Sequence, residues 1–197
     1  MNAAEIISMI VKHNLRIFST ADIITLSELK TDAATQTLRR LQAKGILGKI
    51  KRGIWVSRLN RNILPQEMLP YLTSPWPSYV SLESALSEWG ILSQIPSILF
   101  GVTTGKGRPL KTPDGSFRIY HLQKNLFSDY FVKQAGMRRY PIATPEKAAL
   151  DTLYFRYRLG GKPNFQGWDL EGLNRKTLRT LAKKYPLSIQ QIVKNFF

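Results

Sequence analysis

Residues 38–56 have the sequence LRRLQAKGILGKIKRGIWV. The first part continues a helical pattern that begins near Thr31, and the apolar positions of that pattern fall on one face: Ala34, Leu38 and Leu41. Gly45 comes directly after a basic last turn, where glycine commonly ends a helix. Two short β-prone runs then flank a basic turn that ends in Gly53, which is typical of a β-hairpin. These residues therefore predict a helix that leads directly into a hairpin.

Two further helices are predicted upstream. Asn2 and Glu5 have the spacing of a capping box, and apolar residues then recur at helical spacing over residues 3–13. Ser19 or Thr20 is expected to cap a short second helix. Three helices followed by a hairpin is the order of a winged helix-turn-helix domain, in which the third helix enters the DNA major groove and the hairpin contacts the backbone. We expect this domain to occupy residues 1–62.

The side of the third helix opposite its apolar stripe carries polar and basic residues: Thr35, Gln36, Arg39 and Arg40. Arginine binds guanine through two hydrogen bonds, glutamine binds adenine in the same way, and threonine bonds to bases or phosphates. The hairpin supplies three cations that suit phosphates: Lys49, Lys51 and Arg52. We predict that these seven residues bind DNA. The alternative is a solvated face on an ordinary helical domain.

The charge of the whole chain favours a polyanionic partner. Among 197 residues, 29 Lys and Arg stand against 13 Asp and Glu, so the formal net charge is +16. Residues 1–62 hold 11 basic and 4 acidic side chains, and the rest of the chain is basic as well. Such a charge favours nucleic acid or an anionic membrane. No apolar run approaches the roughly 18–20 residues of a membrane span, and no signal peptide is recognisable. We therefore expect a cytoplasmic protein with a nucleic-acid partner and no membrane.

The region after the hairpin begins with a proline-rich connection over residues 63–79, with a short helix around 66–72, and continues as a second domain over residues 80–197. In that domain we predict a buried strand at 98–104, a turn at 111–116, a returning strand at 117–122 and a short strand at 140–143. Helices are predicted from Ser81, from Thr144, from Asn174 and after Ser188. The fold class is therefore α+β: a winged helix-turn-helix followed by a mixed α/β domain with a small sheet and several helices.

The helix that follows Asn174 carries a second basic surface. Its apolar residues fall on one side, and the cations on the other side are Arg175, Lys176, Arg179 and Lys183. This surface is a second place where a polyanion could bind.

Catalytic and metal-binding patterns are weak. The chain has no cysteine, and its two histidines, His13 and His121, lie far apart in sequence. The glycine-rich segment at 101–107 departs from the phosphate-loop pattern in its glycine spacing and in the residue after its lysine. Glu146 and Asp151 are five residues apart on one helix and do not share a face, and we expect Asp151 to pair with a nearby arginine. We predict no enzyme activity, no catalytic residue, no metal and no cofactor.

The chain resembles the AbiEi family, the antitoxins of type IV toxin–antitoxin (abortive infection) systems. The resemblance rests on LRRLQAKGIL at 38–47 with KRGIW at 51–55, on YVSLESALSEWGI at 79–91 and on TPEKAALD at 144–151. The two later motifs, in this order and spacing, are the more specific ones. Together these motifs cover roughly residues 1–158, and the segment from Gly160 onward is not matched.

This resemblance implies two activities. The winged helix would bind repeats in the protein's own promoter and repress the operon, with the third helix as recognition helix and the hairpin as wing. The C-terminal domain would neutralise a nucleotidyltransferase toxin encoded alongside, and no stable complex with the toxin is implied.

Two other functions compete with the antitoxin. One is a stand-alone winged-helix regulator whose C-terminal domain senses a ligand or dimerises. The other is an enzyme whose basic C-terminal domain acts on nucleic acid or on phosphorylated protein. A neighbouring nucleotidyltransferase gene would favour the antitoxin, a ligand-dependent operator affinity would favour the regulator, and a convergent acid cluster would favour the enzyme.

Overall fold

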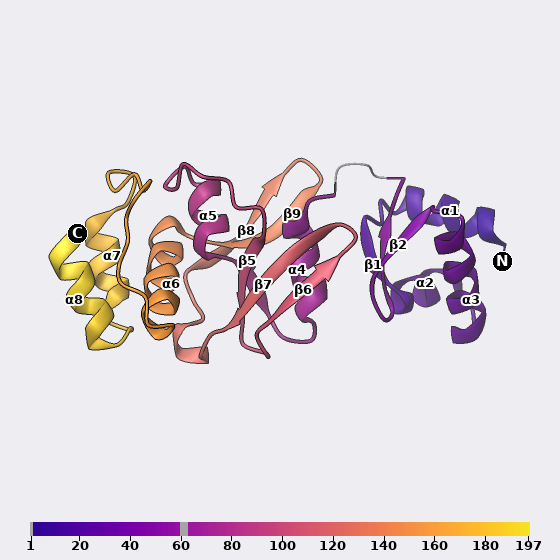
Figure 1. Ribbon diagram of the computed structural model, residues 1–197. Coiled ribbons are helices and arrows are strands. Elements are labelled where there is room, and N and C mark those ends of the chain that lie inside the picture. Colours follow the sequence, from indigo (N-terminus) through magenta and orange to yellow (C-terminus); the bar gives the residue numbers. More distant parts are fainter. Residues whose placement is uncertain (1, 60–62) are drawn as a thin grey trace. The chain divides into compact units, whose positions relative to one another are not determined.

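The computed structural model describes residues 2–59 and 63–197, and the fold is α+β (Figure 1). The chain divides into two compact units, Met1–Leu72 and Thr73–Phe197, which we call the N-terminal unit and the C-terminal unit. No helix within the described ranges is long and apolar enough to cross a lipid bilayer.

The described part of the N-terminal unit combines four helices with a small antiparallel sheet. In chain order its elements are α1 (Ala3–Lys12), β1 (Ile17–Ser19), α2 (Thr20–Ser27), α3 (Thr31–Ala43), β2 (Leu47–Lys51), β3 (Ile54–Ser57) and α4 (Pro65–Thr73). The sheet has the order β1-β3-β2. The capping box of Asn2 and Glu5 is confirmed, and a second one joins Ser19 to Asp22 at the start of α2.

The core of the N-terminal unit lies between the helices and the sheet. The predicted apolar stripe of α3 is confirmed, since Ala34, Leu38 and Leu41 are all buried. They belong to one cluster with Ile6 of α1, Ile23 of α2 and Trp55 of β3. This packing fixes which side of α3 remains exposed.

The segment predicted as a connection is structured in its described part. It holds α4 and begins β4 (Ser78–Val80). Glu67 of α4 is buried and accepts two hydrogen bonds of 2.9 Å from the Arg16 guanidinium, and the backbone N–H of Leu64 donates to the same carboxylate. This paired, charge-assisted contact joins α4 to the segment that precedes β1. Residues 60–62 lie outside the described residues, so the end of the predicted first domain at residue 62 falls there.

The C-terminal unit contains a six-stranded mixed sheet of order β6-β7-β5-β4-β9-β8. Besides β4, its strands are β5 (Leu99–Thr103), β6 (Arg108–Thr112), β7 (Gly115–His121), β8 (Tyr130–Ala135) and β9 (Arg138–Ala143). The returning strand predicted at 117–122 is β7, and across the predicted turn it runs antiparallel to β6. Strand β6 itself was not predicted. The other neighbour of β7 is β5, and these two strands are parallel.

The helices of the C-terminal unit are α5 (Leu82–Glu88), the 3₁₀ helix η1 (Lys124–Leu126), α6 (Pro145–Arg158), α7 (Arg175–Ala182) and α8 (Leu187–Phe196). Thr144 and Asn174 cap α6 and α7 as predicted, whereas α8 begins at Leu187, just before Ser188. Helix α6 contacts α5, α7 and α8, and Figure 1 shows it between the sheet and the α7–α8 pair. Residues 146–155 of α6 are all buried, so this helix is the centre of the unit.

Candidate nucleic-acid interface

One face of the N-terminal unit is concave and is formed jointly by α3 and the β2–β3 hairpin. This hollow, of about 830 Å³, is called here the basic groove, and its lining residues are Thr20, Thr31, Asp32, Ala33, Thr35, Gln36, Arg39, Lys49, Arg52, Gly53 and Trp55. Five of the seven residues predicted to bind DNA therefore meet in one place. The α3 residues among them sit opposite the buried stripe of that helix.

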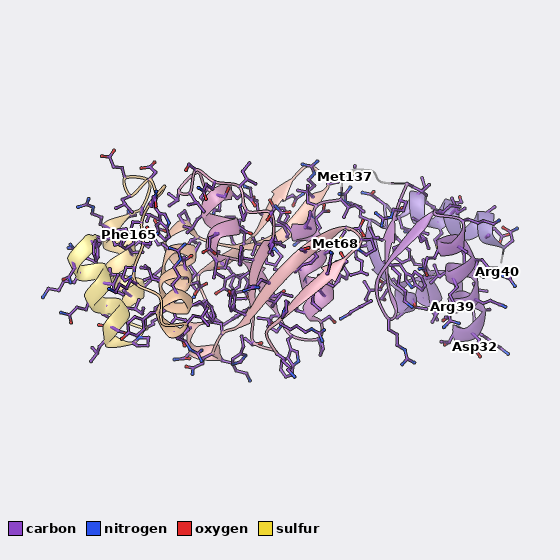
Figure 2. All side chains as sticks on the ribbon, viewed as in Figure 1. Asp32, Arg39, Arg40, Met68, Met137 and Phe165 are labelled. Carbon is purple, nitrogen blue, oxygen red and sulfur yellow. The ribbon has the colours of Figure 1, made fainter. Side chains whose placement is uncertain are left out.

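The other two predicted residues lie outside the basic groove. Arg40 is exposed on α3 but lies about 100° around the helix from Arg39. Lys51 is half-buried at the end of β2. Figure 2 labels Arg39 and Arg40 on α3, together with Asp32 in its first turn. Asp32 is the acid that lines the groove, and there it complements the positive end of the helix dipole.

The hairpin is held against the start of α2 by two hydrogen bonds to one residue. The backbone N–H of Thr20 donates to the carbonyl of Gly53, and the indole Nε1 of Trp55 donates to Thr20 Oγ1, both at 2.9 Å. Gly53 has a φ of 75°, a conformation that side chains with a Cβ rarely adopt. Trp55 is 2% exposed, and Lys49 Nζ lies 5.9 Å from the centroid of its ring. The cations of the hairpin are therefore carried by an anchored support.

Thr20 and Trp55 are groove residues that the sequence analysis did not select. Thr20 was considered only as a helix cap, yet Ser19 is the N-cap and Thr20 is the first helical residue. Trp55 could have been selected from its indole N–H, which needs a hydrogen-bond acceptor once the ring is buried.

The second predicted basic surface is exposed on α7 of the C-terminal unit. Arg175, Lys176, Arg179 and Lys183 all face solvent. Arg179 and Lys183 line a hollow of about 660 Å³ with Lys194 of α8, and Arg175 and Lys176 lie outside it. The four residues thus form two groups, with three of them on α7 and Lys183 directly after it.

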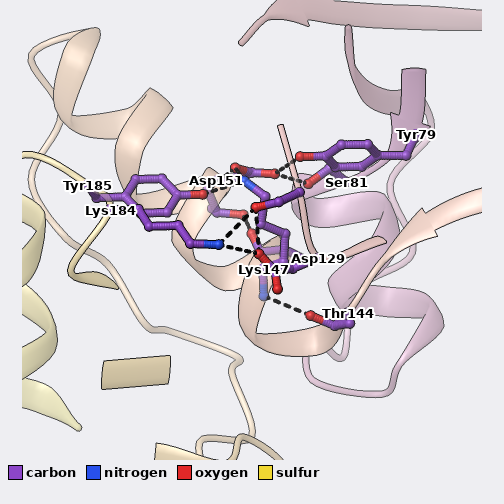
Figure 3. A network of polar contacts seen from close by, with 11 residues as sticks. Tyr79, Ser81, Asp129, Thr144, Lys147, Asp151, Lys184 and Tyr185 are labelled. Atoms are coloured by element: carbon purple, nitrogen blue, oxygen red, sulfur yellow. Dashed lines mark hydrogen bonds and ion pairs between the residues drawn. The ribbon is translucent and has the colours of Figure 1, made fainter. Parts of the chain in front are cut away.

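Four titratable groups of the C-terminal unit, those of Tyr79, Lys147, Asp151 and Tyr185, meet in a buried polar network (Figure 3). Lys147 Nζ lies 2.6 Å from Asp151 Oδ1, and the two side chains are 1% and 0% exposed. The expected arginine partner of Asp151 was wrong: its partner is a lysine one turn earlier on α6. Asp151 also accepts hydrogen bonds from the hydroxyl groups of Tyr79, Ser81 and Tyr185, at 3.2, 2.7 and 2.8 Å. The network therefore joins α6 to β4 and to the connection between α7 and α8.

Burial decides the ionisation of these groups. Burial and the neighbouring Asp151 carboxylate raise the pKa of Tyr79 and of Tyr185 above the tyrosine value of 10.0. Burial lowers the pKa of Lys147, and the attraction of Asp151 offsets part of this effect. None of these groups belongs to the lining of the basic groove or of the hollow beside α7 and α8. The network is suited to holding the core together.

Neither a search for metal sites nor a comparison with known proteins identifies a function for these residues. Among residues 2–59 and 63–197, no three Asp, Glu or His side chains lie close enough together to hold a metal ion. In comparisons with known proteins, no family model and no curated protein matches the chain.

Proposed function

We propose that the N-terminal unit is a winged helix-turn-helix domain that binds double-stranded DNA. The observation that carries this proposal is the basic groove, in which Thr35, Gln36 and Arg39 of α3 face the same hollow as Lys49 and Arg52 of the hairpin. A helix with Gln and Arg on its exposed side has the donors and acceptors that the major groove presents. A hairpin beside that helix places its cations along the phosphate backbone.

The two parts of the groove have different roles in this proposal. Gln36 and Arg39 contact base edges and supply sequence preference. Lys49 and Arg52 contact phosphates and supply affinity that depends on salt. Arg40 and Lys51, outside the groove, contribute less than the five groove residues.

We further propose that the protein is a cytoplasmic type IV antitoxin of the AbiEi kind, which represses its own operon and neutralises a nucleotidyltransferase toxin through the C-terminal unit. The support is the order of the three sequence motifs, together with the basic groove. The alternative, a stand-alone regulator, shares the DNA-binding step and differs in having no toxin partner.

The DNA-binding step is tested by measuring affinity for the protein's own upstream DNA and for a scrambled duplex at two salt concentrations. We expect tighter binding to the upstream DNA, with a log–log salt slope near −0.9 for each of about six to eight phosphates. Lys49→Ala removes a cation that lines the groove. Its matched control is Lys12→Ala, which removes an exposed cation of α1 outside the groove. Equal affinity for both duplexes, or a flat salt dependence, would contradict the proposal.

The antitoxin step needs a separate experiment. Co-expression with a nucleotidyltransferase encoded beside the gene should restore growth, and the C-terminal unit should be required for the rescue. Repression without rescue would favour the stand-alone regulator.

A further inference from the structure

A second hollow, of about 700 Å³, lies in the C-terminal unit between the edge of the sheet and the C-terminal end of α6. We call it the cationic pocket. It is lined by residues of β6, of β7 and of α6, three elements that Figure 1 shows in the same unit. Its volume falls within the roughly 300–1,000 Å³ that is usual for small-molecule sites.

The charge of this pocket has one sign. Lys106, Arg108, Arg118 and Arg158 line it, and no acidic residue does. Within the described ranges, Lys106, Arg108 and Arg118 form no ion pair. Two other cations of the unit do form ion pairs, Arg156 with Glu83 and Lys133 with Glu88. A pocket with several uncompensated cations attracts an anion, and arginine forks suit phosphate above other anions.

The walls of the pocket are apolar. Tyr120 lies two residues after Arg118 on β7 and so shares its face of the sheet. Its ring stacks on Phe155 of α6 with centroids 4.6 Å apart. Leu159, at the end of α6, lines the pocket while remaining 72% exposed. These groups offer a surface to a flat ring, which a bare inorganic anion would leave uncovered.

His121 contributes to the rim of the pocket, and it lies on the other face of β7 from Arg118 and Tyr120. Its Nδ1 lies 2.8 Å from the carbonyl oxygen of Gly105. Because a carbonyl oxygen only accepts, Nδ1 carries the hydrogen. This hydrogen bond holds the ring against the loop between β5 and β6.

We propose that the cationic pocket binds a phosphorylated aromatic ligand of mononucleotide size. The phosphate lies among Lys106, Arg118 and Arg158, and the ring lies against the apolar walls. Duplex DNA fits this pocket less well, because its bases are stacked inside the helix and only its phosphates would be used. The site belongs to the C-terminal unit and is independent of the proposed DNA-binding role of the basic groove.

The proposal is tested by isothermal titration of the full chain with AMP, GMP, CMP and UMP. Adenosine and inorganic phosphate are the two partial probes, and a short duplex is tested as a competitor. We expect at least one mononucleotide to bind more tightly than either partial probe. Arg118→Ala should weaken it about tenfold or more, the usual loss for a charge-assisted hydrogen bond. Leu159→Ser should weaken the nucleotide but leave inorganic phosphate unchanged.

Arg139→Ala is the matched control, since it removes an exposed arginine from a strand of the same sheet outside the pocket. It should bind the nucleotide as the parent chain does. If Arg118→Ala fails to fold, Lys106→Ala tests the same expectation of weaker nucleotide binding. The proposal is overturned if no mononucleotide binds, or if inorganic phosphate binds as tightly as the nucleotide. It is also overturned if duplex DNA displaces the nucleotide from the pocket, or if Arg118→Ala and Lys106→Ala both bind the nucleotide as the control does.

Discussion

The indole of Trp55 donates a 2.9 Å hydrogen bond to Thr20 Oγ1, so a residue of the hairpin is fixed to the first turn of α2. The two residues are 35 positions apart in the chain. Both line the basic groove, and the bond therefore connects the hairpin directly to α2.

Replacement of the Thr20 hydroxyl by a methyl group should lower stability while the side chain keeps its size and shape. Thr20→Val leaves the buried indole N–H without its acceptor, and we expect a loss of about 1–3 kcal/mol in the free energy of unfolding. Thr37→Val is the control, because the Thr37 hydroxyl only donates to the Ala33 carbonyl of its own helix. Urea unfolding measures both variants. Equal losses of unfolding free energy in the two variants would show that the Trp55–Thr20 hydrogen bond contributes no more than the Thr37 hydroxyl.

DNA affinity should distinguish two adjacent arginines. Arg39→Ala removes a groove residue and should cost about 1–3 kcal/mol of binding free energy while relaxing sequence preference. Arg40→Ala should cost less, since Arg40 lies outside the groove. Lys49→Ala should weaken binding to all sequences about equally and reduce the salt slope by about 1. Titration of the upstream and scrambled duplexes gives all three values, and a larger loss for Arg40→Ala would place the DNA on another side of α3.

The buried ion pair should respond unequally to loss of its two members. Asp151→Ala leaves the Lys147 ammonium buried without a counter-charge, for which we expect about 3–5 kcal/mol of destabilisation. Lys147→Met should cost less, because three hydroxyl groups continue to donate to the Asp151 carboxylate. Denaturant unfolding of the two variants checks the order, and the reverse order would mean that the hydroxyls do not stabilise the lone carboxylate.

Alkaline pH should destabilise the C-terminal unit through its buried tyrosines. Above pH 10 tyrosines in the unfolded chain lose their protons, whereas Tyr79 and Tyr185 keep theirs in the folded state because burial raises the pKa of both. The folded state then binds more protons than the unfolded state, so its stability falls as pH rises. Lys147 has the opposite effect. Because folding lowers its pKa, its contribution makes stability rise with pH between that lowered pKa and pH 10.5.

The tyrosine contribution can be isolated by substitution. Tyr185→Phe removes one of the two raised groups, so its stability should decline less steeply above pH 10 than that of the parent chain. Tyr157→Phe changes a tyrosine that is 51% exposed and should keep the parent slope. Unfolding midpoints measured across this pH range give the comparison, and identical slopes in all three proteins would contradict it.

The N-terminal unit could be predicted largely from sequence because its signals are local. Capping residues, the apolar stripe of α3 and the glycine at the hairpin act within a few positions of one another. These signals also placed five of the seven proposed DNA contacts on one groove. What they lacked was the Trp55–Thr20 bond, because nothing local indicates which distant hydroxyl a buried indole will find.

The C-terminal unit was harder because its contacts are long-range. Strand β6 contains a proline and is mostly exposed, so it lacked the apolar alternation that marks a strand. Without it nothing in the sequence indicated that β6 follows β5 in the chain and that β7 then lies parallel to β5. The partner of Asp151 was also missed, because a buried lysine on the same helix is an uncommon choice and arginine is the more usual one.

The Tyr185 hydroxyl also bears on where this protein can be shortened. A chain cut after Leu159 would keep every motif on which the family resemblance rests, so a comparison of motifs alone would judge it intact. Such a fragment would nevertheless lose Tyr185 and both helices that cover α6, and water would reach the Lys147–Asp151 pair. The last helices are thus an integral wall of the C-terminal unit, and a useful minimal fragment has to retain them.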